Sequence, residues 1–277
     1  MAASVVERFR EPAVDESAPF HVGHPLDRVP GMLLFSGLLD LAVRADSARS
    51  CGRRAGRVVA GLDFPWSCEF ERGTTLSCRP VPGRNRAWTV AARQDAREVC
   101  AGSIAFADDD GPAAGPPGPA RPLAAMPPPR HAPVDLVHRH RPENLQVGEP
   151  VRRGRGAVEA AVLRPPGRDR AAWSPVEIVE AGRQFAALLE HGEHGEHGEH
   201  GRPMDVRLLW APVRLDVPFR LGGAVPLLLR WQVARMPGPR SRCAATLADA
   251  STGAGLGSLA YEAYAVDAER CERTRSS

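Results

Sequence analysis

Residues 174–192 read SPVEIVEAGRQFAALLEHG, and this stretch predicts a single helix. Ser174 is a typical N-cap residue, because its side-chain oxygen can accept a hydrogen bond from a backbone N–H of the first turn. Pro175 suits the first helical position, where the missing N–H has no partner to lose. Four stretches that follow are apolar between turn signals and predict strands. They are MDVRLLWAPVRLDVPF (204–219), AVPLLLRWQVARM (224–236), RCAATLADA (242–250) and GLGSLAYEAYAVD (255–267).

The N-terminal part of the chain repeats this order of a helix followed by strands. PGMLLFSGLLDLAVRA (30–45) is apolar almost all round, which predicts a helix buried on most of its sides. Strand-like stretches then follow, namely RVVAGLDF (57–64), CEFERGTTLSCRPV (68–81), RAWTVAARQ (86–94) and EVCAGSIAFA (98–107). A strand pair is also expected ahead of the second helix, in DLVHRHRPENLQVG (135–148) and GRGAVEAAVL (154–163).

A Pro- and Gly-rich stretch divides the chain. ADDDGPAAGPPGPARPLAAMPPPRHAP (107–133) lacks hydrophobic periodicity and predicts a semi-extended linker. A helix wrapped by an antiparallel sheet is an α+β unit, and its occurrence twice predicts a pseudo-dimer within one chain. The expected parts are a first half (1–107), the linker (108–133), a second half (134–270) and a tail (271–277).

Composition argues against several classes of protein. The chain is 43% hydrophobic and 25% charged, as in a globular protein. It has no apolar run of about 18 residues, and its N-terminus is charged where a signal peptide is apolar, so we expect a cytoplasmic protein that does not bind membranes. All 36 basic residues are arginines, spread along the chain with a net charge of +3, which argues against nucleic acid as a partner. The six cysteines form no C-x-x-C pair and are expected to be buried apolar residues.

Three stretches resemble the A-factor biosynthesis hotdog family, the γ-butyrolactone synthases of actinomycetes. GHPLDRVPGMLL (23–34) resembles the family signature DHPLDHVPGM, and LVHRHRPENLQVG (136–148) is similar to its VH(R/K)…PENVL strand. SPVEIVEAGRQ (174–184) is similar to its helix start DPLLLAETIRQ. The resemblance implies a tandem double hotdog, although the two halves stand in the reverse of the usual order.

The resemblance also implies site residues on the hotdog helices. The family has a glutamate, an arginine and a glutamine there, and the second half keeps them as Glu180, Arg183 and Gln184. Such a carboxylate can act as a general base, and an arginine can bind a phosphate or a developing oxyanion. The pattern alone favours a different interpretation, in which these residues and Glu177 form the solvent-facing side of an amphipathic helix. The first half has lost the set, with Ser36, Leu39 and Asp40 at the corresponding positions.

The first half offers its own candidates near the start of its helix. His24 is a catalytic candidate with Asp27 as its orienting partner, although Gly23 and Arg28 replace two residues of the family signature. A similar turn in hydroxyacyl-carrier-protein dehydratases favours His21 instead, and a turn histidine is more often structural. Gly31 follows Pro30 at the helix start, where free N–H groups could bind a thioester carbonyl, or where glycine simply allows close packing.

Other conspicuous residues are interpreted as structural. Four Glu-His-Gly triplets lie in LLEHGEHGEHGEHGRP (188–203), and we expect an expanded surface loop rather than a designed metal site. His138 and His140 are expected within a strand. Gly222-Gly223 and GAGLG (253–257) lack the context of a nucleotide-binding loop and predict turns. Neither a metal nor a cofactor is expected.

The functional expectation follows from the resemblance. It implies an enzyme that transfers a β-ketoacyl group from acyl carrier protein or acyl-CoA to dihydroxyacetone phosphate or a similar phosphorylated acceptor. Two alternatives remain open: a hotdog dehydratase or thioesterase acting on acyl thioesters, and a protein that binds an acyl ligand without transforming it. The hotdog fold hosts all of these functions, so the fold alone does not choose among them.

Overall fold

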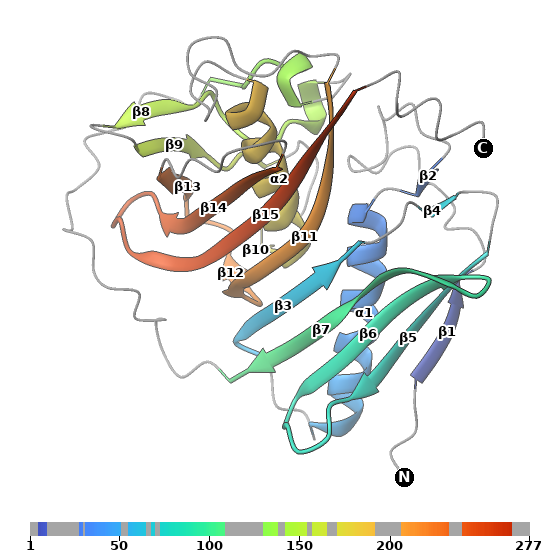
Figure 1. The fold of residues 1–277 in the computed structure, drawn as a ribbon. Helices are drawn as coiled ribbons and strands as arrows, with labels where there is room; N and C mark the ends of the chain where they lie inside the picture. The colour runs from blue at the N-terminus through green and yellow to red at the C-terminus, as the bar shows by residue number, and fades with distance from the viewer. Residues whose placement is uncertain are drawn as a thin grey trace.

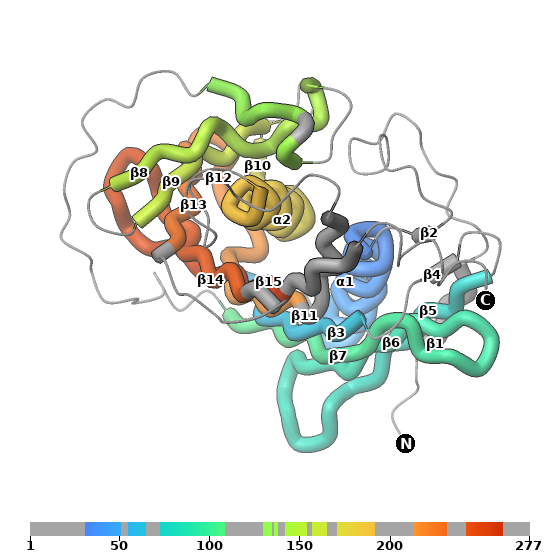
Figure 2. Tube along the Cα trace, turned by 45° about the horizontal axis from the view of Figure 1, so that its top comes forward, coloured from blue at the N-terminus to red at the C-terminus, as the bar shows by residue number. Residues whose placement is uncertain are grey.

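An antiparallel sheet curves around two helices, both of which lie against its concave face (Figures 1 and 2). In the described part of the chain the sheet has eleven strands, in the order β1-β5-β6-β7-β3-β11-β15-β14-β13-β9-β8. The computed structural model describes residues 5–9, 28–29, 31–50, 55–64, 68–69, 73–108, 130–137, 142–153, 157–164, 171–191, 206–232 and 240–267.

The first half contains one long helix and the strands that pack on it. Its elements are β1 (Val5–Phe9), β2 (Arg28–Val29), α1 (Gly31–Arg49), β3 (Arg57–Asp63), β4 (Cys68–Glu69), β5 (Thr74–Pro80), β6 (Ala87–Gln94) and β7 (Arg97–Ala107). The described residues of the expected strand 68–81 form β4 and β5. Helix α1 is buried on most sides, as its sequence predicts, with Phe35, Leu38 and Leu41 among its fully buried residues.

The second half repeats the arrangement. Its elements are η1 (Asp135–Val137), η2 (Pro142–Asn144), β8 (Val151–Arg153), β9 (Ala157–Ala161), β10 (Ala172–Trp173), α2 (Pro175–His191), β11 (Val206–Pro218), β12 (Leu221–Gly222), β13 (Leu227–Gln232), β14 (Arg240–Asp249) and β15 (Gly255–Asp267). Helix α2 begins as predicted: the Ser174 hydroxyl accepts a hydrogen bond from the Glu177 backbone N–H (3.2 Å), and the Glu177 carboxylate accepts one from the Ser174 N–H (2.8 Å). This reciprocal pair is a capping box.

The strand order shows that the two halves are copies of one unit. Reading outward from the centre of the sheet gives β3-β7-β6-β5-β1 on one side and β11-β15-β14-β13-β9 on the other. Each half also has a small two-stranded sheet, β2 with β4 and β10 with β12. In each half a helix precedes its four long strands, so the predicted internal pseudo-dimer of α+β units is confirmed.

The two half-sheets join where β3 pairs with β11. Two ion pairs cross this seam, Arg57 to Asp216 (2.6 Å) and Arg214 to Asp63 (3.1 Å). The flanking strands approach it so closely that only glycine fits at one position in each. A Cβ on Gly102 of β7 would lie 1.9 Å from the Gly61 carbonyl oxygen, and one on Gly257 of β15 would lie 2.2 Å from the Asp216 carbonyl oxygen.

The expected strand over 135–148 is wrong. Its described residues, 135–137 and 142–148, contain the 3-10 helices η1 and η2 instead, followed by isolated bridges at Val147 and Gly148. Pro142 explains part of the difference, because its fixed φ suits a helical first position and it has no N–H for a strand ladder. The partners of β9 are therefore β8 and β13. His138 and His140 lie outside the described residues.

The described cysteines are buried as expected, whereas only some of the glycines expected in turns lie there. Cys78, Cys100 and Cys243 are buried as expected, and burial raises the pKa of the Cys78 thiol to about 11. Of the glycines expected in turns, Gly223 and Gly253 lie outside the strands, while Gly222, Gly255 and Gly257 lie within them. No described helix is long and apolar enough to cross a membrane.

Candidate functional site

The polar residues of α2 are buried, not exposed. Glu180 and Gln184 have 0% of their surface accessible, and Arg183 has 9%. Glu177, which belongs to the capping box, is buried as well. The interpretation of these residues as the solvent-facing side of the helix is therefore wrong. The three-and-four spacing does place them together, as expected for one helix face.

Glu180 and Arg183 form a two-point ion pair inside the protein. Arg183 donates from Nε to Glu180 Oε2 (2.8 Å) and from Nη2 to Glu180 Oε1 (2.7 Å). Gln184 donates from Nε2 to the same Oε1 (2.8 Å). Burial by itself lowers the pKa of Arg183, but the charge and hydrogen bonds of Glu180 outweigh it, so the pKa of Arg183 lies above its ordinary value. The carboxylate is thus held in one orientation with its charge compensated.

Gln184 connects this pair to the last residue of η2 and to the segment that follows it. Its Nε2 also donates to the Asn144 carbonyl oxygen (3.0 Å), and its Oε1 accepts a hydrogen bond from the Gln146 backbone N–H (2.8 Å). The stretches PENLQ and EAGRQ, about 40 residues apart in the sequence, are therefore in direct contact. We name the buried set Glu180, Arg183, Gln184 and Gln146 the α2 cluster.

The side-chain amide of Gln146 is buried, and neither its nitrogen nor its oxygen has a hydrogen-bond partner in the part of the chain that the structure describes. A buried polar group without a partner is costly, at about 1–3 kcal/mol. The α2 cluster therefore contains an amide that a bound molecule or a water could satisfy. Sequence reasoning missed Gln146, because it lies beyond the residues Pro142, Glu143 and Asn144 that match the family stretch PENVL.

Tyr261 of β15 lies on the other side of α2. Its hydroxyl donates to the Val179 carbonyl oxygen (2.7 Å), and a Cβ on Gly182 would lie 2.6 Å from that hydroxyl. Burial, then the neighbouring Cys243 and Glu180, raises the pKa of Tyr261 well above its ordinary value, and Arg183 opposes this. Sequence reasoning missed Tyr261. The signal that could have found it is Gly182, since a glycine inside a helix often marks close packing.

The first half has no matching cluster in its described residues. Ser36 is half-buried, Leu39 is buried among apolar side chains, and Asp40 is exposed on α1. Gly31 is exposed at the first residue of α1, and a Cβ there would meet only the Phe64 ring at 3.6 Å. The candidates His21, His24 and Asp27 lie outside the described residues, as do the last three Glu-His-Gly triplets. Glu190 and His191 of the first triplet are described and are buried at the end of α2, so the expected surface loop does not include them. Within the described ranges, no three His, Cys, Asp or Glu side chains are grouped as metal ligands.

Solved structures show what this architecture is. The chain is similar to an acyl-CoA thioesterase II, TesB2, from Mycobacterium marinum, with 14% identity and a TM-score of 0.56 over 86% of this chain and 89% of that one. It is also similar to a hotdog-fold protein of unknown function from Alicyclobacillus acidocaldarius, with 10% identity and a TM-score of 0.58 over 95% of this chain and 93% of the other. The fold is a double hotdog.

A third structure extends the similarity to almost the whole double hotdog. The bifunctional dehydratase-cyclase domain of ambruticin biosynthesis matches 99% of this chain and 93% of its own, with 18% identity and a TM-score of 0.57. No protein-family model matches the chain. No curated protein matches it either. At these identities the comparisons establish the fold, while the expected relationship to A-factor biosynthesis rests on the three sequence stretches.

Proposed function

We propose that this double hotdog protein hydrolyses an acyl thioester at one asymmetric site built around Glu180. The observation that carries the proposal is the buried, oriented carboxylate of Glu180. At the corresponding position of α1 the residue is Ser36, which has no carboxylate. Two of the similar structures are by name a dehydratase-cyclase domain and an acyl-CoA thioesterase, so acyl-thioester chemistry occurs on this architecture. The substrate is an acyl group carried by coenzyme A or by acyl carrier protein.

Hydrolysis fits the α2 cluster because it requires one group that accepts a proton. Water attacks the thioester carbonyl carbon, Glu180 takes a proton from that water, and the C–S bond breaks. The departing sulfur then takes the proton, which leaves a carboxylic acid and a thiol. Dehydration needs a group that also protonates a departing hydroxyl. Among the described residues of the cluster, Arg183 and Gln184 do not exchange protons in the neutral pH range.

The other residues of the cluster have supporting roles in this proposal. Arg183 fixes the Glu180 carboxylate through two hydrogen bonds, and Gln184 holds the same carboxylate against the segment after η2. A carboxylate that accepts several hydrogen bonds is stabilised as an anion and is a weak base. When water attacks the thioester carbonyl carbon, Arg183 therefore has to move some of its hydrogen bonding from Glu180 to the developing oxyanion. This makes Glu180 a stronger base as the water loses its proton.

A panel of thioesters tests the reaction class. The protein is incubated with saturated, 3-hydroxy and β-keto acyl-CoA, and products are followed by thiol release and mass spectrometry. Hydrolysis gives free thiol and free acid in equal amounts. Loss of water with the thioester intact would replace the proposal by a dehydratase. Binding of acyl-CoA without any product would show a protein that holds the ligand unchanged.

Acyl transfer is the second candidate, favoured by the stretches GHPLDRVPGMLL and LVHRHRPENLQVG. Here the hydroxyl of dihydroxyacetone phosphate takes the place of water, so that an ester forms as the C–S bond breaks. The same β-ketoacyl assay with this acceptor distinguishes the two. A new phosphorylated ester would establish transfer, and free acid alone would establish hydrolysis.

A further inference from the structure

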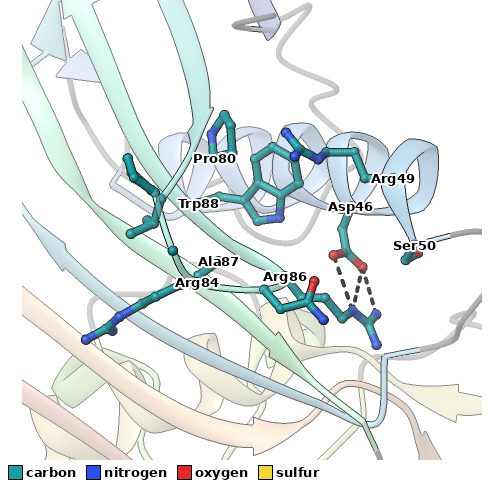
Figure 3. A pocket seen from close by; sticks show the side chains of 12 residues that line it. Asp46, Arg49, Ser50, Pro80, Arg84, Arg86, Ala87 and Trp88 are labelled. Atoms are coloured by element: carbon teal, nitrogen blue, oxygen red, sulfur yellow. Dashed lines mark hydrogen bonds and ion pairs between the residues drawn. The ribbon is translucent and has the colours of Figure 1, made fainter. Parts of the chain in front are cut away.

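A depression of about 450 Å³ lies at the C-terminal end of α1, far along the chain from the α2 cluster. Its wall is the end of α1 and the hairpin that joins β5 to β6 (Figure 3). None of the residues that line it belongs to α2 or β15. The residues that matter for its chemistry are Asp46, Arg49, Arg84, Arg86 and Trp88.

Trp88 provides a buried hydrogen-bond donor without a partner. Only 3% of Trp88 is accessible, and its indole Nε1–H donates to no atom of the described residues. Figure 3 shows the nitrogen on the side of the ring that faces Asp46 and Arg86. Because an indole nitrogen is a donor only, the missing partner must be an acceptor.

Among the described charged residues named here, arginines outnumber carboxylates around the depression. Arg86 binds Asp46 through Nε (3.2 Å) and Nη2 (2.7 Å), and its Nη1 binds Asp108, so this one guanidinium holds both carboxylates. Arg49 and Arg84 are exposed at the rim, and the Arg49 guanidinium lies 5.6 Å from the centre of the Trp88 ring. The two carboxylates and three guanidiniums therefore sum to one positive charge.

We propose that this depression binds a phosphate group of a small molecule. Phosphate oxygens supply the acceptor that the Trp88 indole lacks, and guanidinium groups pair with phosphate through parallel hydrogen bonds. The carbonyl end of α1 opposes an anion here, so Arg49 and Arg84 must provide the attraction. The Arg84 side chain points away from Trp88 in Figure 3 and, being exposed, must turn toward the depression to do so. This is a second site, separate from the α2 cluster, and it does not depend on the reaction carried out there.

The alternatives to phosphate fit less well. A cation would meet Arg49 and Arg84 and would leave the indole N–H without an acceptor. An apolar ligand would also leave that donor unsatisfied, at a cost of the same kind as in the unoccupied protein. A water molecule can satisfy the indole but needs neither rim arginine, which gives the experiment a clear contrast.

Isothermal titration calorimetry of the whole protein at low ionic strength tests the site, because salt screens exposed charges. The probes are inorganic pyrophosphate, 3′,5′-ADP and acetate. Trp88→Phe removes the N–H while keeping an aromatic ring under Arg49. Arg49→Gln and Arg84→Gln remove the rim charges. Arg79→Gln is the matched control, since Arg79 is exposed on β5 beside the hairpin and does not line the depression.

We expect pyrophosphate to bind, with the affinity weakened about tenfold by each of the three site variants and unchanged in Arg79→Gln. Tighter binding of 3′,5′-ADP with the same variant pattern would indicate a nucleotide as the source of the phosphate. If acetate binds as tightly as pyrophosphate, the site recognises carboxylates in general and the proposal is contradicted. The proposal is also overturned if the wild-type protein binds none of the probes. Unweakened binding of pyrophosphate by Arg84→Gln, an exposed substitution that leaves the fold intact, would overturn it as well.

Discussion

At the scale of single residues, the α2 cluster contains a buried ion pair, and removing either partner should destabilise the fold. Glu180 is fully buried and Arg183 nearly so, and the two form an ion pair at 2.7 Å. Burying a charge is costly unless it is paired, and removing one partner leaves the other uncompensated. The pair therefore links the stability of the second hotdog to the residues we assign to its chemistry.

Arg183→Met should destabilise the protein by about 3–5 kcal/mol, because Glu180 would lose its cation while remaining buried. Chemical denaturation measures the change. Arg93→Met is the control, since Arg93 pairs with Glu98 at 3.4 Å on the surface with both side chains largely exposed, and it should cost less than about 1 kcal/mol. Equal effects of the two substitutions would show that the buried pair contributes no more than a surface pair. The double variant Glu180→Leu with Arg183→Met should recover much of the loss.

At the scale of the elements, the sequence predicts features that depend on residues close together in the chain, such as the start of a helix. Ser174 and Glu177 indicated the start of α2 because a capping box involves residues three apart. The alternating polar pattern of 135–148 predicts a strand, but Pro142 has no N–H for a strand ladder and favours the 3-10 helix η2 instead. The burial of Glu180 could not be predicted from α2 alone, because the segment that covers it carries Asn144 and Gln146, about 40 residues earlier in the sequence.

Gly182→Ala tests how closely α2 approaches β15. Alanine normally stabilises a helix relative to glycine by about 1 kcal/mol. Here its Cβ would lie 2.6 Å from the Tyr261 hydroxyl and 2.8 Å from a Leu259 methyl group, so we expect a net loss of about 1–3 kcal/mol instead. Thermal and chemical unfolding give the sign. Tyr261→Phe should relieve part of the loss in the double variant, and a stabilised Gly182→Ala protein would contradict the packing.

At the scale of the whole molecule, two copies of one α+β unit form a single sheet. Only the second copy carries the glutamate and arginine of the α2 cluster. The mirrored strand order indicates the repeat, while Ser36 and Leu39 of α1 stand where α2 has Glu180 and Arg183. The sequence predicted the repeat because helix and strand periodicities are local properties. It could not predict the close approach at the seam, which brings Gly102 and Gly257 against strands from other parts of each half.

Gly257→Ala should weaken the pairing of β15 with β11 beside the seam, because its Cβ would lie 2.2 Å from the Asp216 carbonyl oxygen and the backbone would have to move. We expect a loss of at least about 1–3 kcal/mol. Gly255→Ala in the same strand is the matched control, since a Cβ there has nothing within 4 Å. If equilibrium unfolding shows the two variants to be equally stable, β15 does not approach β11 as closely as described.

The central claim, that Glu180 activates the oxygen nucleophile on an acyl thioester, is tested most directly by Glu180→Gln. This substitution keeps the size of the side chain and removes its ability to accept a proton. The measurement is kcat for thiol release from the best acyl-CoA of the panel, with circular dichroism confirming the fold and acyl-CoA binding measured in parallel. The proposal predicts a fall in kcat of about 10²–10⁴-fold with binding retained. A folded Glu180→Gln protein that releases thiol at the wild-type rate would contradict it.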